Sequence, residues 1–462
     1  MKLPVAFKDV KDKLDNVGCG FCIAKWSQVT MHLHNGLTHS CHHPAPHKIP
    51  LNEIKRNPKA LHNTRFKKQR RKEMLDGKRP DECNFCWNVE DNSNSFSDRV
   101  FKSTEPWSIN DFDKIKDSYW RDDFNPRYVE VSFGNTCNFA CAYCGPQYSS
   151  KWVEEIEKHG GYPTEHKFNS IDDIKARDQM PYKQTEHNPY IEAFWEWWPN
   201  LFPDLHTFRI TGGEPLLLKD TFKVLEYIQK HHNQNSNISL AINTNLGIPD
   251  KLLDKFITIA KDLCDNNKVR ELIIFTSVEA TDAQAEYARF GLKYEKFWSN
   301  VDKVLSNLPK VTVNIMATYN ALSVFSYSDL IDRVFEYKKK YANGERYWVS
   351  ALQLDTSYLR WPTHLSVKIL EEEHKELILK SAEKALYYGI KNFTEDNYGF
   401  SNVEIQKMKR LYDYAVGDTA FNTDKYRKDF VKFVDEYDKR RGTDFLGTFP
   451  QLKELYAEYK ER

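Results

Sequence analysis

Six short apolar runs between residues 126 and 360 constrain the fold more than any other feature of the sequence. In chain order they are RYVEVSF, HTFRITG, ISLAINT, VRELIIFTS, VTVNIMAT and YWVSALQL. Each is rich in β-branched or aromatic residues, which favours strands. Amphipathic helical stretches such as KDTFKVLEYIQKHH and YEKFWSNVDKVLSNL separate most of them. Six strands alternating with helices require a parallel sheet with right-handed crossovers, which is either open and doubly wound or a partial barrel.

The chain divides into three parts around this region. Residues 1–105 hold five of the nine cysteines, and the polar stretch NVEDNSNSFSDR marks the edge of this part. Residues 126–360 contain the expected sheet, and residues 361–462 are charged and helical, as in EEEHKELILKSAEKALYYG. We therefore expect an α/β protein with an amino-terminal cysteine-rich domain and a carboxyl-terminal helical region.

Charge and hydropathy narrow the class of protein. The net charge is +1, which argues against a general nucleic-acid or membrane-surface protein. No apolar run approaches the roughly 20 residues of a membrane helix. The segment MKLPVAFKDVKDKLDNVG lacks the unbroken apolar core of a signal peptide. These features predict a soluble, cytoplasmic protein.

Eight of the nine cysteines lie in tight groups, which in a large chain without a secretion signal indicates metal binding rather than disulfides. The segment GNTCNFACAYCGP directly follows the first apolar run, so Cys137, Cys141 and Cys144 lie at the carboxyl edge of the expected sheet, where ligands bind. Thiolates select zinc, copper(I) or iron–sulfur clusters. A four-iron cluster used only for electron transfer takes four thiolates. Three thiolates leave one iron open, as chemistry on a bound molecule requires.

The alternative is a zinc site that takes a histidine from elsewhere. Zinc loops more often use cysteine pairs two residues apart, with a second pair at a distance. A spacing of three residues and then two, with the aromatic Tyr143 before the last cysteine, is not a usual zinc spacing. We therefore favour an iron–sulfur cluster.

The segment CNFACAYC resembles the CxxxCxxC signature of the radical S-adenosylmethionine superfamily, including the aromatic residue. The resemblance implies a partial (β/α)6 TIM-like barrel in which these three cysteines hold a [4Fe–4S] cluster. It also implies that the amino and carboxylate groups of S-adenosylmethionine chelate the fourth iron. The missing protein ligand would then be the cosubstrate.

Further motifs follow in the order that the superfamily would have them. GGEP ends the second expected strand, NTN the third and TSVEA the fourth, and YARFG comes later. By resemblance, Glu214 would bind the methionyl ammonium group, Ser277 and Glu279 would contact the methionyl carboxylate and the ribose, and Arg289 would pair with the carboxylate. Many relatives have Asp at the position of Glu279. The full set of expected cosubstrate contacts is Tyr143, Gly212, Gly213, Glu214, Thr244, Ser277, Glu279, Arg289 and Asn320.

A second group of cysteines lies in CGFC, THSCHH and CNFCW. The region resembles SPASM and twitch domains, which bind auxiliary clusters and end in P-x-x-C-x-x-C. By that resemblance an auxiliary [4Fe–4S] cluster would be held by Cys22, Cys41, Cys83 and Cys86. Cys19 could replace Cys22 or stay free, and zinc is the main alternative metal. These domains usually follow the barrel, whereas here the cysteines precede it.

Three other features have plainer explanations. The histidines at 32, 34, 39, 42, 43 and 47 are expected to be surface residues or neighbours of the cluster ligands, although one could exchange a proton with substrate. Residues 55–79 carry eleven Lys or Arg against two acids, which fits a solvated helix face better than an RNA or acidic-peptide site. Cys264 lies at core spacing and is expected to be a buried structural thiol.

The resemblance implies reductive cleavage of S-adenosylmethionine to a 5′-deoxyadenosyl radical, with an electron donor such as flavodoxin or ferredoxin. The first expected substrate is a peptide or protein side chain, which would be oxidised, cross-linked or epimerised. The second is a small alcohol or sugar, as in some twitch relatives. A zinc-stabilised module without enzymatic activity is the third alternative. The residues do not identify the abstracted hydrogen atom.

Overall fold

The computed structural model describes residues 6–342, 350–393, 398–417 and 420–461. Nine of the described strands form one sheet in the order β11-β10-β8-β7-β6-β4-β1-β2-β3. Their bounds are β1 Gln28–His32, β2 Leu37–His39, β3 His47–Lys48, β4 Tyr128–Ser132, β6 Thr207–Thr211, β7 Ser239–Asn243, β8 Glu271–Thr276, β10 Thr312–Tyr319 and β11 Leu352–Tyr358. Two short strands, β5 Ala140–Cys141 and β9 Arg289–Phe290, pair with each other outside this sheet.

The six expected strands are present as β4, β6, β7, β8, β10 and β11, and each runs parallel to its neighbour. This confirms an α/β fold with a mostly parallel sheet. A doubly wound sheet reverses its strand order at a switch point. These six strands keep their chain order, which favours the partial barrel of the two alternatives. The last strand continues to Tyr358, beyond its expected run at 347–354, because it pairs with β10 as far as Tyr319, and residues 347–349 lie outside the described residues.

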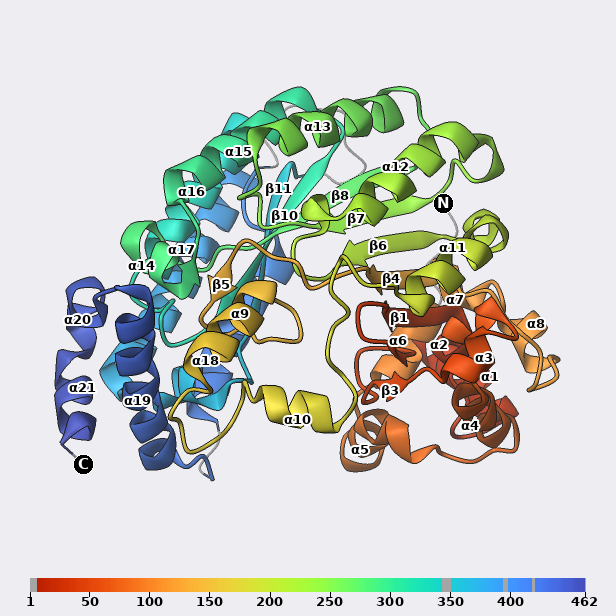
Figure 1. Ribbon diagram of the computed structural model, residues 1–462, viewed down its shortest axis with the longest axis horizontal. Coiled ribbons are helices and arrows are strands. Elements are labelled where there is room, and N and C mark those ends of the chain that lie inside the picture. Colours follow the sequence, from red (N-terminus) through yellow and green to blue (C-terminus); the bar gives the residue numbers. More distant parts are fainter. Residues whose placement is uncertain (1–5, 343–349, 394–397, 418–419, 462) are drawn as a thin grey trace.

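Helices cover the outer face of this sheet (Figure 1). They follow one another in chain order as α11 Pro189–Leu201, α12 Lys219–His231, α13 Asp250–Asp265, α15 Tyr294–Asn307 and α16 Tyr327–Lys340. Right-handed crossovers between neighbouring strands place successive helices on the same side. The shorter helices of this part are α9 Ser150–His159, α10 Ile171–Ala176 and α14 Asp282–Ala288.

The two faces of the sheet differ in polarity because successive side chains of a strand point to opposite faces. In β10, Val313, Ile315 and Ala317 are fully buried in the main core, whereas Asn314 and Met316 between them are partly exposed. Burying each Val or Ile side chain stabilises the fold by about 1.5–3 kcal/mol. β11 alternates in the same way and leaves Gln353 and Asp355 partly exposed, so these two strands present polar side chains on the inner face.

The amino-terminal part joins the same sheet. β1 runs parallel to β4 and places His32 beside Ser132, while β2 and β3 continue the sheet in antiparallel pairs. The sheet therefore continues across the boundary expected near residue 105. A separate cluster of buried residues, including Leu14, Trp26 and Trp87, forms a second core here. The helices are α1 Phe7–Val17, α2 Ala24–Ser27, α3 Leu51–Ile54, α4 Arg65–Leu75, α5 Asn84–Asn92, α6 Asp98–Thr104, α7 Pro106–Ile109 and α8 Phe112–Lys116.

The carboxyl-terminal part is helical and packs against the sheet part. Its helices are α17 Glu372–Phe393, α18 Asn402–Val416, α19 Thr423–Arg441, α20 Phe445–Thr448 and α21 Lys453–Lys460. The hydroxyl of Tyr437 in α19 donates to the carbonyl of Tyr287 in α14 at 2.6 Å, which ties the two parts together. Among the described helices, none combines the length and the apolar composition needed to cross a membrane.

Candidate functional site

The three-cysteine loop, residues 134–146, follows β4 at the carboxyl end of the parallel strands. Cys141 lies in β5 and pairs with Arg289 in β9. Trp152 in α9 donates its indole N–H to the carbonyl of Cys141 at 2.9 Å, and the N–H of Cys137 donates to Ser150 Oγ at 3.2 Å. These bonds fix the backbone of the loop, in which the three cysteine residues as a whole are partly exposed.

Burial is the largest influence on these thiols. It raises the pKa of Cys137 to about 12, and it also raises the pKa of Cys141 and Cys144. For Cys137 and Cys144, the neighbouring thiols add to the effect. Two donors act in the opposite direction: Arg289 Nη1 lies 3.7 Å from Cys141 Sγ, and Asn245 Nδ2 lies 3.9 Å from Cys137 Sγ. Thiolates are the form that binds metal, so loading of this loop requires loss of these protons.

The GGEP turn is pressed against the three-cysteine loop. The N–H of Glu214 donates to the carbonyl of Thr136 at 2.7 Å, and that of Gly213 donates to the carbonyl of Gly134 at 3.1 Å. A Cβ on Gly213 would lie 2.4 Å from the Thr136 carbonyl oxygen, so only glycine allows this approach. Gly212 adopts φ of 128°, a backbone conformation that L side chains rarely adopt.

The Glu214 side chain is fully buried and links two strand ends. Its carboxylate accepts the N–H groups of Leu216 at 2.9 Å and Asn245 at 2.6 Å. Burial raises its pKa to about 7, against the lowering effect of these hydrogen bonds. Glu214 therefore connects the ends of β6 and β7 next to the three-cysteine loop.

Three of the expected contacts form one buried group. Arg289 donates two hydrogen bonds to Glu279 Oε2, at 2.9 and 2.8 Å, and the Tyr143 hydroxyl lies 3.1 Å from both Glu279 oxygens. Burial raises the pKa of Tyr143 well above its usual value and also raises that of Glu279, whereas the paired Glu279 raises the pKa of Arg289 despite burial. This group places a cation beside Cys141.

The other expected contacts lie at the strand ends but differ in accessibility. Thr244 is buried, and its hydroxyl accepts the N–H of Leu246 at 3.1 Å. Ser277 is partly exposed after β8. Asn320 is fully buried, and its side chain donates to the Thr318 carbonyl at 2.7 Å and accepts from Leu322 at 2.9 Å. The side chains of Thr244 and Asn320 therefore make local backbone contacts.

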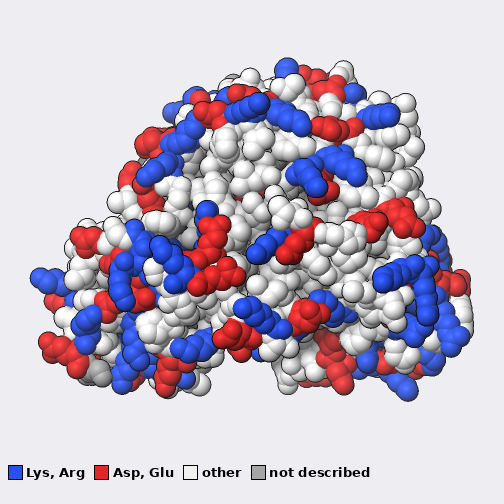
Figure 2. Space-filling view, viewed as in Figure 1, with Lys and Arg blue, Asp and Glu red and all other residues white. Residues whose placement is uncertain are grey.

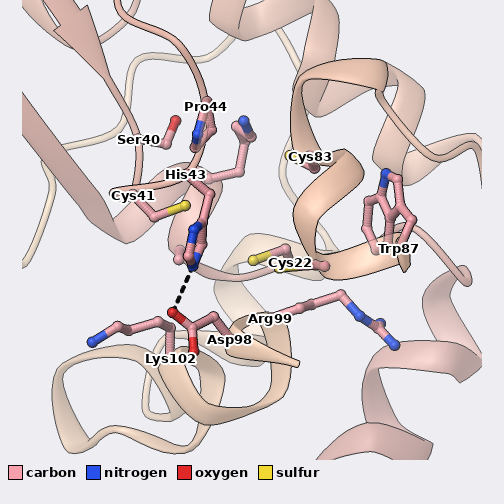
Figure 3. Close-up of a pocket in the computed structure, with 13 residues that line it drawn as sticks. Cys22, Ser40, Cys41, His43, Pro44, Cys83, Trp87, Asp98, Arg99 and Lys102 are labelled. Atoms are coloured by element: carbon pink, nitrogen blue, oxygen red, sulfur yellow. Dashed lines mark hydrogen bonds and ion pairs between the residues drawn. The ribbon is translucent and has the colours of Figure 1, made fainter. Parts of the chain in front are cut away.

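The structure brings the second group of cysteines together around one pocket. Cys22, Cys41, Cys83 and Cys86 all line it, with Lys25, His43, Asp98, Arg99 and Lys102 among their neighbours. Figure 3 shows the side chains of Cys22 and Cys41 on opposite sides of this space, and His43 bonded to Asp98 at 2.7 Å. Burial is the main cause that raises the pKa of each thiol, to about 11 for Cys86. Cys19 is exposed, and its thiol lies 3.4 Å from the carbonyl of Gly77.

The sulfur atoms of the two cysteine groups are not in tight contact with one another. Within the described residues, only Glu371, Glu373 and His374 bring three candidate ligand atoms within 4.8 Å of one another. In each cysteine group, the sulfur atoms therefore do not all lie within that distance of one another.

A second pocket lies between the three-cysteine loop and the amino-terminal part. Cys144, Tyr148, His32, Asn35 and Trp361 are among its lining residues. Burial lowers the pKa of His32 to about 4, so the ring is neutral near pH 7. Its Nε2 lies 3.3 Å from the Nε2 of another histidine, while its buried Nδ1 has no hydrogen-bond partner among the described residues.

The histidines of the amino-terminal part occupy different positions. His39 bonds the carbonyl of Cys41, and His43 lines the pocket of the second cysteine group. His34 bonds Ser132 Oγ at 2.8 Å, and His47 bonds Thr64 Oγ1 at 3.1 Å. These contacts account for most of the histidine-rich segment without a metal, and they leave His32 as the ring that faces the pocket beside Cys144.

The basic segment 55–79 is only partly a surface feature. Lys67 and Arg71 in α4 are buried, whereas Arg65 and Lys78 are exposed. Figure 2 shows Lys and Arg gathered at the right-hand edge, over the amino-terminal part, with acidic residues interspersed over the rest of this face. Cys264 is buried in α13, as expected for a structural thiol, and burial raises its pKa to about 12.

Two contributors to the site carry no local signal in the sequence. Arg441 in α19 donates to the carbonyl of Ala140 at 2.6 Å and pairs with Glu155 at 2.8 Å, so the carboxyl-terminal part supports the three-cysteine loop. Lys25 lines the pocket of the second cysteine group and is 2% exposed. Arg441 is three hundred residues from the loop in sequence, and only the tertiary fold brings it there.

Comparison with known families adds one finding. Residues 131–320 match the family model of the Radical SAM superfamily. This range runs from the end of β4 to Asn320 and includes the three-cysteine loop, the GGEP turn, Glu279 and Arg289. A search of the curated proteins gave no match. The matched range supports a radical SAM domain, with the [4Fe–4S] cluster and S-adenosylmethionine that such a domain uses.

Proposed function

We propose that the chain is a radical SAM enzyme that abstracts a hydrogen atom from its substrate. The observation that carries this proposal is the position of Cys137, Cys141 and Cys144. They lie together, partly exposed, at the carboxyl ends of parallel strands, within the range that matches the superfamily.

These three thiolates would hold a [4Fe–4S] cluster. When bound, the cluster and S-adenosylmethionine supply a 5′-deoxyadenosyl radical that removes a hydrogen atom from substrate. An external donor such as a flavodoxin or ferredoxin would provide the electron. The side chains of Arg289 and Asn245 point N–H groups at two of the sulfur atoms and stabilise their negative charge. Trp152 and Arg441 hold the loop backbone from outside.

The remaining expected contacts, Tyr143, Gly212, Gly213, Glu214, Thr244, Ser277, Glu279 and Asn320, are proposed as the frame of the cosubstrate site. Gly213 and Glu214 fix the loop against the strand ends, and the Tyr143–Glu279–Arg289 group forms one buried wall. Ser277 is the member left partly exposed at a strand end.

The second cysteine group is proposed to hold an auxiliary [4Fe–4S] cluster of SPASM or twitch type. Cys22, Cys41, Cys83 and Cys86 all face one pocket, which supports this four-thiolate set and leaves Cys19 outside it. A cluster with four protein ligands has no open metal site, so its role would be to accept or pass an electron.

The substrate is proposed to bind in the pocket beside Cys144. The cavity has a volume of about 590 Å³. This lies within the roughly 300–1000 Å³ of a site for one small molecule. The described lining residues offer His32, Asn35, Arg177 and aromatic rings but no carboxylate. A peptide or protein side chain is the first candidate, and the polar groups of this lining also support a small alcohol or sugar.

Anaerobic reconstitution with iron and sulfide tests the proposal. Two four-iron clusters require about eight irons per chain, and dithionite with S-adenosylmethionine should then yield 5′-deoxyadenosine. Cys141→Ala should abolish this product, whereas Cys19→Ala, which alters an exposed thiol outside both groups, should leave it intact. Undiminished product from Cys141→Ala would refute the assignment.

Two further assays address the finer parts of the proposal. Cys83→Ala combined with Cys86→Ala should remove about half of the iron and leave S-adenosylmethionine cleavage in place. Deuterated candidate peptides, alcohols and sugars should be compared for deuterium transfer into 5′-deoxyadenosine. Transfer from one class and not from the others identifies the substrate class.

A further inference from the structure

The pocket beside Cys144 lies at the open side of the sheet. The sheet ends in β11 at one edge and in β3 at the other. Trp361 follows β11 in sequence and Pro46 directly precedes β3, and both residues line this pocket together with Cys144. The two ends of the sheet therefore approach each other across the pocket, and a substrate can enter between them.

One segment of the chain crosses this opening. It comprises residues 165–182 and contains α10, which Figure 1 shows between the carboxyl-terminal helices and the amino-terminal part. At one end, the buried carboxylate of Asp429 in α19 accepts the N–H of Glu165 at 2.5 Å. At the other end, the N–H of Tyr182 donates to the carbonyl of His34 at 2.7 Å. Because both ends are fixed, the segment holds its own side chains at the pocket.

This crossing segment brings a cation to the pocket. Arg177, directly after α10, is the one Lys, Arg, Asp or Glu among the described lining residues. Its neighbour in sequence, Asp178, pairs with Lys48 at 2.8 Å, whereas Arg177 forms no ion pair in the described part of the chain. The Asn35 side chain donates to the carbonyl of Gln179 at 3.4 Å, which ties the backbone beside Arg177 to the amino-terminal part. The guanidinium is therefore held near the pocket without a carboxylate of this chain.

The same pocket exposes two large aromatic side chains. Tyr148 is 48% exposed and Trp361 is 47% exposed, and both line it. The ring of His166 in the crossing segment packs edge-on against Trp361, with the ring centres 4.6 Å apart. Aromatic rings offer a large apolar surface at little cost in conformational entropy. A ligand with an apolar or aromatic body fits these two rings.

The polar wall of the pocket lacks one hydrogen-bond donor. Asn35 is 3% exposed and lines the pocket, and its Oδ1 has no hydrogen-bond partner among the described residues. A buried acceptor without a donor is costly. An amide N–H of a bound ligand would supply that donor, and peptides carry such groups whereas simple alcohols and acids do not.

We propose that this pocket selects a peptide-like substrate that carries a carboxylate, and that Arg177 binds the carboxylate. The proposal rests on the proposed function in placing the substrate beside Cys144. A guanidinium presents its N–H groups in a planar fork that matches the two oxygens of a carboxylate. The described lining offers no Asp or Glu to repel that anion. Tyr148 and Trp361 hold the apolar part of the same molecule, and Asn35 accepts its amide N–H.

Binding of matched acids and amides tests this selectivity. N-acetylphenylalanine and its amide share one ring and differ in charge, so they probe a terminal carboxylate. The N-acetylated, C-terminally amidated dipeptides of phenylalanine with glutamate or glutamine probe an acidic side chain in the same way. Each is titrated calorimetrically, without oxygen, into the reconstituted full-length protein and into Arg177→Gln and Arg177→Lys. Lys175→Gln is the control, because Lys175 is exposed on the same helix and does not line the pocket.

In at least one of the two pairs, the wild type should bind the charged member about fivefold or more tightly than the neutral one. That pair identifies whether the carboxylate is terminal or belongs to a side chain. The ratio should fall to within about twofold of unity in Arg177→Gln and recover in part in Arg177→Lys. Lys175→Gln should keep the wild-type ratio. Trp361→Ala should weaken both members of a pair by the same factor, because the ring contacts their shared apolar part.

Two results would overturn the inference. One is a ratio within about twofold of unity in the wild type for both pairs. The other is a preference for the acid that survives in Arg177→Gln or is lost equally in Lys175→Gln. Formation of 5′-deoxyadenosine is measured separately on the same preparation. Its absence would count against the radical chemistry while leaving the acid preference measurable, whereas its presence without that preference would refute the role of Arg177 alone.

Discussion

Replacing Gly213 with alanine should detach the three-cysteine loop from the strand ends. The added Cβ would lie 2.4 Å from the Thr136 carbonyl oxygen and 2.6 Å from the carbonyl carbon of Asn135. All of these are backbone atoms, so no side-chain rotation can relieve the overlap. Overpacking of this kind costs about 1–3 kcal/mol. Weakening the two backbone hydrogen bonds of the turn adds about 1 kcal/mol each.

The expected loss is therefore about 3–5 kcal/mol in the free energy of unfolding. It should be measured by urea denaturation of the metal-free protein, and iron retention should be measured after reconstitution. Gly161→Ala is the matched control, because a Cβ there meets nothing within 4 Å. If Gly213→Ala unfolded within 0.5 kcal/mol of the wild type and kept its full iron, the close approach would not matter and the reasoning would be wrong.

Two further predictions concern the buried carboxylates. Burial raises the pKa of Glu214 from 4.5 to about 7, so between these pH values the native state holds a proton that the unfolded state releases. The free energy of unfolding should therefore fall by about 3 kcal/mol as the pH rises from about 4.5 to about 7. Urea denaturation should show this slope in the wild type and a flatter one in Glu214→Gln; equal slopes would contradict the assignment. Glu279→Gln should cost about 3–5 kcal/mol because it leaves Arg289 buried and unpaired. Adding Arg289→Met should recover part of that loss, and a double variant less stable than the single one would count against the pair.

The sequence was most informative where the pattern is local. The six apolar runs predicted the parallel strands because strand preference and helical periodicity can both be recognised within a few consecutive residues. The cysteine spacing identified both thiol groups. Cys22 rather than Cys19 faces the pocket, as the resemblance to the auxiliary-cluster domains implies.

Contacts between segments that lie far apart in the sequence could not be predicted from such local patterns. The sequence did not indicate that β1 would extend the sheet beside β4, because its five residues QVTMH resemble many short strands. The run of basic residues at 55–79 was expected to be a solvated face, yet Lys67 and Arg71 turn inward. Their burial depends on which face of α4 meets the rest of the amino-terminal part. Arg441 reaches the three-cysteine loop only through the packing of α19.

The central claim is that Cys137, Cys141 and Cys144 hold a four-iron cluster in which the fourth iron has no protein ligand and binds S-adenosylmethionine. Mössbauer spectroscopy of the protein reconstituted with ⁵⁷Fe tests this most directly, with spectra taken before and after S-adenosylmethionine is added. The account predicts that a single iron site changes its isomer shift and that the change is lost in Cys141→Ala. Identical spectra before and after addition, or zinc in place of iron at these cysteines, would contradict it.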